Sequence, residues 1–303
     1  MTRKGCIWGW IIGVVGLLVV FLVTLVAIET LLGQRISLPT AGARVGLVRI
    51  EGALIDPAAI IDDLEAVQRD AGVRSLVIRI ESPGGGVAAS QEIYDRITKV
   101  SKEGLPIVVS MGAIAASGGY YVACPADTIM ANPGTLTGSI GVIMSFTQFE
   151  ELFRKIGMDF EVVKSGEYKD VGTWSREMTD EERELLQETV DDLHDQFVET
   201  VASERGLPIE EVRAIADGRI LSGRQALAVG LVDTLGSLDD AVALAGRMAG
   251  IEGEPRVWEP VKPRRLTLFD LLASSIARAF ERPSSSLGAQ YLYGPPSGLH
   301  KSI

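Results

Sequence analysis

Short apolar runs rich in β-branched residues alternate with amphipathic stretches from about residue 45 onward. The runs predict strands, at Val45–Ile50, Ser75–Ile80, Ile107–Ser110, Thr128–Ala131, Val142–Ser145 and Phe160–Val163. The stretches between them predict helices, over Pro57–Ala71, Val87–Lys102 and Thr147–Ile156, with a short helix beginning near Ser117. Strand–helix units that repeat at this length predict an α/β fold, in which helices cover a largely parallel sheet.

The longest helix is predicted from Thr179 to about Arg205. Thr179 and Glu182 form a capping box at its start. Apolar residues recur on one face of this helix, at Leu186, Val190, Leu193, Phe197 and Val201. A second capping box, Ser222 with Gln225, predicts a further helix that ends before Gly230.

Residues 7–28 are apolar and carry no charge. A helix of this length reaches roughly 33 Å, enough to span a hydrocarbon core of about 30 Å. No small-x-small cleavage site follows it, which favours an uncleaved anchor over a removable signal peptide. Arg3 and Lys4 predict a cytoplasmic N-terminus, so the chain from about Gln34 onward would be extracytoplasmic.

These patterns divide the chain into four parts. Residues 1–28 hold the cytoplasmic N-terminus and the transmembrane anchor, and residues 29–44 form a linker. Residues 45–250 carry the strand–helix pattern of one folded domain. Residues 251–303 form a C-terminal extension, which we expect to be partly disordered because its end is rich in Ser, Pro and Gly.

Charge and composition exclude several kinds of function. The net charge is −11 and no basic stripe is present, so nucleic acid is not an expected partner. The two cysteines, Cys6 and Cys124, cannot build a disulfide framework or a metal site. The two histidines, His194 and His300, lack a second ligand at metal-binding spacing, so neither a metal nor another cofactor is predicted.

The scarcity of histidine also limits hydrolytic mechanisms. His194 lies in the long predicted helix beside three aspartates, and we interpret it as a solvated helix residue. A hydrolase built from this chain would therefore need a base other than histidine, and lysine is the usual substitute.

Two glycine-bearing turns each follow a predicted strand. The first, Glu81–Gly86, lacks the spacing of a nucleotide-binding loop. The second contains Ser117 at the start of a short helix, followed by Gly118. Each turn alone could be purely structural. Together, at one carboxyl edge of a parallel sheet, the N–H of Gly84 or Gly85 and that of Gly118 would form an oxyanion hole beside the serine hydroxyl.

Several motifs, in this order, resemble those of the signal peptide peptidase A family in its short form. They are Glu81–Gly86, Ser110–Tyr121, Leu136–Gly141 and Lys164–Asp170, continued by Ser175–Thr179, Asp217–Arg219 and Gly230–Asp233. The resemblance covers roughly residues 45–249, and a membrane anchor is also expected of this family. It implies a fold similar to the Clp protease and crotonase group, a spiral of β-α units, in chains that assemble into a homo-oligomeric ring.

The resemblance also assigns roles to individual residues. It implies that Ser117 is the nucleophile, that Lys169 is the general base, and that Ser139 forms a hydrogen bond with the lysine. The residues alone do not choose among Lys155, Lys164 and Lys169. A base at this position must be neutral, which requires that burial lower the lysine pKa from about 10.4 toward 7–8.

The function implied is a membrane-anchored serine endopeptidase with its catalytic domain outside the cytoplasm. It would degrade remnant signal peptides and other apolar peptides at the lipid bilayer through an acyl-enzyme, with a preference for small or aliphatic residues. A non-catalytic membrane scaffold of the same fold is the alternative. A crotonase-like acyl-CoA enzyme is a third possibility, which the lack of a basic patch for CoA phosphates disfavours.

Overall fold

The computed structural model describes Leu17 and residues 42–260. The predicted anchor, apart from position 17, and most of the linker lie outside this part, as do residues 261–303. Among the residues described, no helix combines the length and the apolar character needed to cross a membrane. The transmembrane segment therefore stays a prediction.

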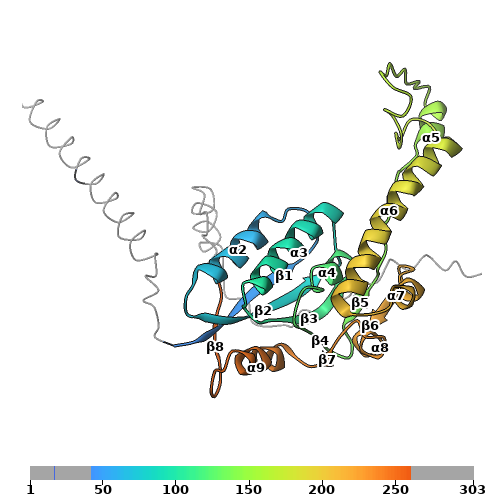
Figure 1. Cartoon of the computed structure of the whole chain (residues 1–303). Coiled ribbons are helices and arrows are strands. Elements are labelled where there is room, and N and C mark those ends of the chain that lie inside the picture. The colour runs from blue at the N-terminus through green and yellow to red at the C-terminus, as the bar shows by residue number, and fades with distance from the viewer. Residues whose placement is uncertain (1–16, 18–41, 261–303) are drawn as a thin grey trace, which may run out of the picture. The chain divides into compact units, whose positions relative to one another are not determined.

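An eight-stranded sheet forms the centre of the described chain (Figure 1). Its strands are β1 (Arg44–Glu51), β2 (Val73–Ser82), β3 (Ile107–Ala116), β4 (Thr128–Ala131), β5 (Leu136–Gly138), β6 (Ile220–Ser222), β7 (Thr234–Leu235) and β8 (Arg256–Trp258). The order β6-β5-β3-β2-β1-β8 is parallel except for the pair β5 and β6. β4 pairs with the first part of β3 and β5 with its last part, and β7 pairs with β4.

The helices of the described chain lie on both faces of this sheet and, in part, beyond it. They are α2 (Ala58–Arg69), α3 (Val87–Lys102), α4 (Gly118–Tyr121), α5 (Glu150–Lys155), α6 (Asp180–Arg205), α7 (Ile209–Ile215), α8 (Gly223–Ala228) and α9 (Leu238–Met248). Figure 1 shows α2 and α3 on one face and α9 on the other. Successive strand residues point to opposite faces. Val48 and Ile78 thus belong to the larger core cluster, whereas Leu47 and Val77 pack toward α9.

Much of this architecture was predictable. Val87–Lys102 and Thr128–Ala131 have the predicted bounds, and both predicted capping boxes are present. The strands predicted at Val142–Ser145 and Phe160–Val163 are wrong, because neither segment pairs with another strand. At the other end, β8 pairs with β1, so the sheet includes residues beyond position 250.

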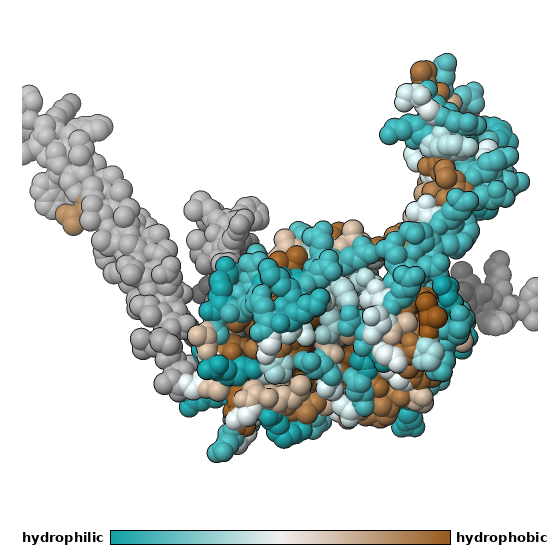
Figure 2. Space-filling model, viewed as in Figure 1, coloured by the Kyte–Doolittle hydropathy of each residue, from teal (hydrophilic) through white to brown (hydrophobic). Residues whose placement is uncertain are grey.

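The segment of residues 143–185, called the projecting segment below, differs from the rest. In Figure 1, α5 lies beside the first turns of α6, away from the sheet. Figure 2 shows hydrophobic residues interrupting its hydrophilic surface. Four aromatic rings pack against one another there, those of Phe149, Phe153, Phe160 and Trp174. The second half of α6 instead packs on the core, through Phe197, Val198 and Val201.

Candidate active site

Ser117 lies at a tight turn between β3 and α4. Its backbone has φ 54° and ψ −124°, a conformation that residues with a side chain rarely adopt. The turn is fixed from both sides. The Ser117 N–H donates to the carbonyl of Gly138 over 2.8 Å, and the Ser117 carbonyl accepts from the N–H groups of Tyr120 and Tyr121. Such strain concentrates at functional sites, so the turn marks Ser117 as a candidate reactive residue.

The first glycine turn lies directly against this serine. A methyl group on Gly84 would come within 2.9 Å of the Ser117 Cβ, and one on Gly118 would come within 3.3 Å of the Gly85 nitrogen. The Gly84 N–H donates to Ser82 Oγ over 3.1 Å. Within residues 42–260, no acceptor faces the N–H of Gly85 or of Gly118. Two donors are therefore available beside the hydroxyl, and Gly85, rather than Gly84, supplies one of them.

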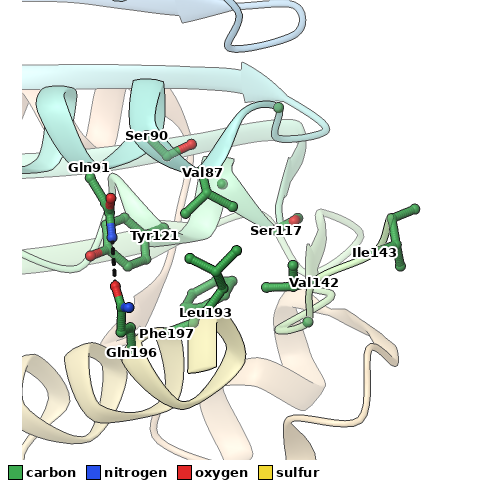
Figure 3. A pocket seen from close by; sticks show the side chains of 13 residues that line it. Val87, Ser90, Gln91, Ser117, Tyr121, Val142, Ile143, Leu193, Gln196 and Phe197 are labelled. Carbon is green, nitrogen blue, oxygen red and sulfur yellow. Dashed lines mark hydrogen bonds between the residues drawn. The ribbon is translucent and has the colours of Figure 1, made fainter. Parts of the chain in front are cut away.

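A pocket of about 120 Å³, called the inner pocket, opens beside Ser117 (Figure 3). Val87, Tyr121, Val142, Ile143, Leu193 and Phe197 form its apolar walls, and Ser90, Gln91 and Gln196 add polar groups. A hydrogen bond of 3.1 Å from Gln91 Nε2 to Gln196 Oε1 joins α3 to α6 across the end away from Ser117. An apolar cavity of about 150 Å³ holds a benzene molecule. The inner pocket thus has the size and the walls for one aliphatic side chain.

A second hollow of about 490 Å³, called the outer cavity, also borders Ser117. Ser139 lies on its wall, held by a hydrogen bond of 2.8 Å from its N–H to the carbonyl of Arg219, and its φ is 50°. His194 borders the same cavity, and its Nε2 is buried without a partner among the described residues. His194 is thus half-buried on the wall of this cavity, less solvated than the helix residue that the sequence predicted.

Lys169 is exposed and borders neither cavity. The next residue, Asp170, forms an ion pair with Arg176, which also pairs with Glu182 in the first turn of α6. Leu193, on the wall of the inner pocket, follows Glu182 by 11 residues, about 16 Å along the helix axis. Within one copy of the chain, Ser117 thus meets the glycines and Ser139 but not Lys169.

The other candidate lysines do not reach Ser117 either. Lys155 pairs with Glu151 over 3.8 Å on α5, and Lys164 pairs with Asp170 over 2.6 Å. Neither borders the inner pocket or the outer cavity. Among residues 42–260, no lysine or arginine lines either space, so none of the three candidate lysines meets Ser117 within one copy.

Some features of the site carried no signal in the sequence. The Gln91–Gln196 bridge joins residues 105 positions apart, which only the packing of α3 against α6 brings together. The ion pairs around Arg176 were also missed, although the segment Ser175–Thr179 had been singled out by its resemblance. Charged residues in a loop usually indicate a solvated surface, so their pairing was not visible in the sequence.

A serine held in a strained turn beside two unpaired N–H groups, at the edge of a parallel sheet, is the arrangement of a serine hydrolase. The model of peptidase family S49 matches residues 99–252, and the Clp protease model matches residues 51–137. The chain belongs to peptidase family S49, the signal peptide peptidase A family, and is a serine protease with a Clp protease-like α/β domain.

Curated relatives support this assignment. A Synechocystis sp. protein named as a protease is 44% identical over 231 residues, which cover 74% of this chain and 83% of that protein. The chloroplastic serine protease SPPA of Arabidopsis thaliana is 32% identical over 84% of this chain and 36% of its own length. Protease 4 of Salmonella typhi is 36% identical over 70% of this chain and 35% of its own length. The chain thus spans only about a third of the last two proteins.

Proposed function

We propose that this chain is a membrane-anchored serine endopeptidase that cuts remnant signal peptides and other apolar peptides outside the cytoplasm. Ser117 is the nucleophile and Lys169 the general base. One observation carries the proposal: Ser117 borders a pocket that Gly85 and Gly118 also line, and the N–H groups of these two glycines have no acceptor among residues 42–260. A non-catalytic scaffold has no need for this combination.

The base comes from a second copy of the chain in this proposal. Lys169 is exposed at the end of α6 that is remote from Ser117. The outer cavity brings Ser117 and Ser139 to one space, and no cation of the same copy among residues 42–260 enters it. In a homo-oligomeric ring, each copy would insert Lys169 into the outer cavity of its neighbour. A head-to-tail contact of this kind repeats around a ring until the ring closes.

The reaction then follows from these positions. The Lys169 amine takes the proton from Ser117 Oγ as the oxygen attacks the peptide carbonyl. The N–H groups of Gly85 and Gly118 donate to the resulting oxyanion. Lys169 returns the proton to the leaving amine, which gives an acyl-enzyme. Water, deprotonated by the same amine, then releases the acid.

The inner pocket supports the predicted class of substrate. A side chain entering it from a peptide bound at Ser117 would meet the apolar surfaces of Tyr121, Leu193 and Phe197. Desolvating a charged side chain there without a counter-ion is costly. Small or aliphatic residues are therefore the expected choice, as the apolar cores of signal peptides provide.

The anchoring part of the proposal depends on the sequence. The uncharged stretch of residues 7–28, with Arg3 and Lys4 before it, would hold the chain as a single-pass protein of the cell membrane. The catalytic domain would then lie beside the bilayer, where cleaved signal peptides remain. Protease protection in spheroplasts tests this topology, since a cytoplasmic domain would resist added protease.

A fluorophosphonate probe tests the nucleophile. In detergent, the full-length chain should be labelled at Ser117, and Ser117→Ala should lose labelling and lower peptide hydrolysis by about 10³-fold or more. Lys169→Ala should lower hydrolysis to a similar extent, because an unassisted serine hydroxyl is a weak nucleophile. Retained hydrolysis in either variant would remove that residue from the mechanism. An unlabelled chain without hydrolysis would favour the scaffold.

Co-expression of the two inactive variants tests the shared site. In a randomly mixed ring, about one quarter of the interfaces would join an intact Ser117 to an intact Lys169. Such samples should regain a comparable fraction of the activity, whereas each variant expressed alone stays inactive. A dyad contained within one copy predicts no recovery. A double variant, Ser117→Ala with Lys169→Ala, co-expressed with either single variant is the matched control and should stay inactive.

A further inference from the structure

The loop that presents Lys169 is closed on itself by charged groups. Lys164 Nζ donates to Asp170 Oδ1 over 2.6 Å and to the carbonyl of Glu167 over 2.7 Å. The Lys169 N–H donates to the carbonyl of Gly166 over 3.2 Å. Lys169 therefore lies between residues 167 and 170, which Lys164 links by hydrogen bonds. Its backbone is fixed, while its side chain stays exposed.

Arg176 joins this loop to α6. Its Nε and Nη2 donate to the two carboxylate oxygens of Asp170 over 2.9 and 2.8 Å. Its Nη1 donates to Glu182 Oε2 over 2.8 Å, and Nη2 reaches Glu182 Oε1. Glu182 is itself fixed, because the same Oε2 accepts from the Thr179 N–H in the capping box of α6. One planar guanidinium thus bridges the residue next to Lys169 and the first turn of a 26-residue helix.

The electrostatics of the bridge agree with its geometry. The carboxylate side chains are 12% exposed at Asp170 and 5% exposed at Glu182, although they lie outside the apolar core. Hydrogen bonds from Arg176, and then from Lys164, hold the pKa of Asp170 well below its usual range. Arg176 and the Thr179 N–H lower the pKa of Glu182 to about 2. Both carboxylates are therefore charged at neutral pH, and the bridge is complete.

We infer that Arg176 is a positioning residue for Lys169. This inference rests on the proposed function, because it assumes that the Lys169 amine acts on Ser117 of a neighbouring copy. A base that must reach into another copy depends on the orientation of its loop, and a misplacement of about 1 Å can cost 10²-fold in rate. α6 supplies a rigid reference, since its second half packs on the core of the same copy.

If Arg176 positions Lys169 through its geometry, a lysine at position 176 should not replace it. A lysine ammonium is a point charge, whereas the guanidinium donates in a fixed fork to two carboxylates at once. Arg176→Lys should keep the charge and lose the geometry. We expect it to behave almost like Arg176→Ala, which a purely electrostatic role does not predict.

The test is a double-mutant cycle on the rate of fluorophosphonate labelling at Ser117, in the full-length chain in detergent. Arg176→Ala alone should lower this rate, and the kcat for peptide hydrolysis, by about 10²-fold, with KM little changed. In the Lys169→Ala background, adding Arg176→Ala should change the residual labelling rate little, because no amine is left to position. Arg183→Ala removes a charge from the same turn of α6, where its side chain makes no ion pair among the described residues, and should match the wild type.

Two results would overturn the inference. An unchanged kcat in Arg176→Ala would show that the loop needs no bridge. An equal loss in the wild-type and Lys169→Ala backgrounds would show a structural role, such as loss of assembly, which sedimentation of the same samples reveals. Full labelling of Lys169→Ala alone would instead contradict the proposed function, so the two failures are distinguishable.

Discussion

Apolar side chains are mostly buried in the sheet and its covering helices, and mostly exposed in the projecting segment. Among residues 42–260, no hydrophobic side chain between Gly141 and Gln196 is buried, whereas the strands and the helices on them bury most of theirs. Thirteen of the twenty-one exposed large hydrophobic residues in the described chain lie in the projecting segment. Ile143 is 87% exposed and Val163 is 95% exposed.

This difference indicates two different sources of order. The sheet is stabilised by its own core, so it can hold Ser117 in an unfavourable conformation. The projecting segment is held by ion pairs and by a few stacked aromatic rings, and its exposed apolar surface is of the kind that marks an interaction site. Such a surface beside Lys169 supports a ring in which neighbouring copies cover it and complete one another's sites.

The largest effect expected on the sheet side comes from the glycine turn. A methyl group on Gly85 would lie 2.2 Å from the Leu54 carbonyl oxygen, so Gly85→Ala must displace the turn and its N–H. Loss of one oxyanion donor lowers kcat by about 10²–10³-fold. Gly86→Ala is the matched control, because its methyl group would lie 3.6 Å from the same oxygen, an ordinary contact. Similar kcat values for the two variants would rule out the Gly85 N–H as a donor.

The next largest expected effect is a difference in the free energy of unfolding between core and projecting-segment variants. Ile78 is fully buried in the larger core, so Ile78→Ala should lower the free energy of unfolding by about 2–5 kcal/mol. Val163→Ala should change it by less than about 0.5 kcal/mol, as for other surface substitutions. Urea unfolding of both full-length variants measures the contrast. A large loss from Val163→Ala would mean that the projecting segment contributes to the core.

The smallest expected effect is the response of the Arg176 bridge to acid. The pKa of Glu182 is about 2 in the folded chain and about 4.3 in an unfolded one. Its contribution to stability is therefore complete above pH ~5 and is lost as the pH falls from about 4.3 toward 2.

Unfolding of wild type and Glu182→Gln between pH 2 and 7 measures this contribution. The stability difference should be constant near neutrality and shrink over the acid range. Glu181→Gln, in the same turn but without a side-chain hydrogen bond in the described chain, should show no such dependence. A difference that persists unchanged at pH 2 would mean that the charge of Glu182 is not what stabilises the bridge.

The sequence predicted the longer strands of the sheet and several helices in both regions, including α5 and the start of α6, and it was wrong at two apolar runs, for one physical reason. Local signals determine Val87–Lys102 and the capping box at Thr179, because caps and helical spacing act within a few residues. The apolar runs Val142–Ser145 and Phe160–Val163 have the composition of strands, but composition does not reveal whether a neighbouring strand exists. Strands of two or three residues, such as β7 and β8, are visible only once their partners are placed.

The candidate site divides in the same way. The serine and the glycine turns follow from where strands end, and the structure brings them together as expected. The position of the lysine depends on the length of α6 and on a loop held by long-range ion pairs, which no spacing in the sequence specifies. The distance between Ser117 and Lys169 within one copy was accordingly not foreseen.

The backbone of Ser117 has a consequence for variants of this chain. A positive φ at a residue with a side chain costs on the order of 1–3 kcal/mol, and glycine adopts such values freely. Ser117→Gly would therefore lose the hydroxyl and yet relieve the turn, whereas Ser117→Ala keeps the unfavourable conformation. The difference in melting temperature between an inactive Ser117→Gly variant and the active chain would measure how much stability the conformation of the reactive serine costs.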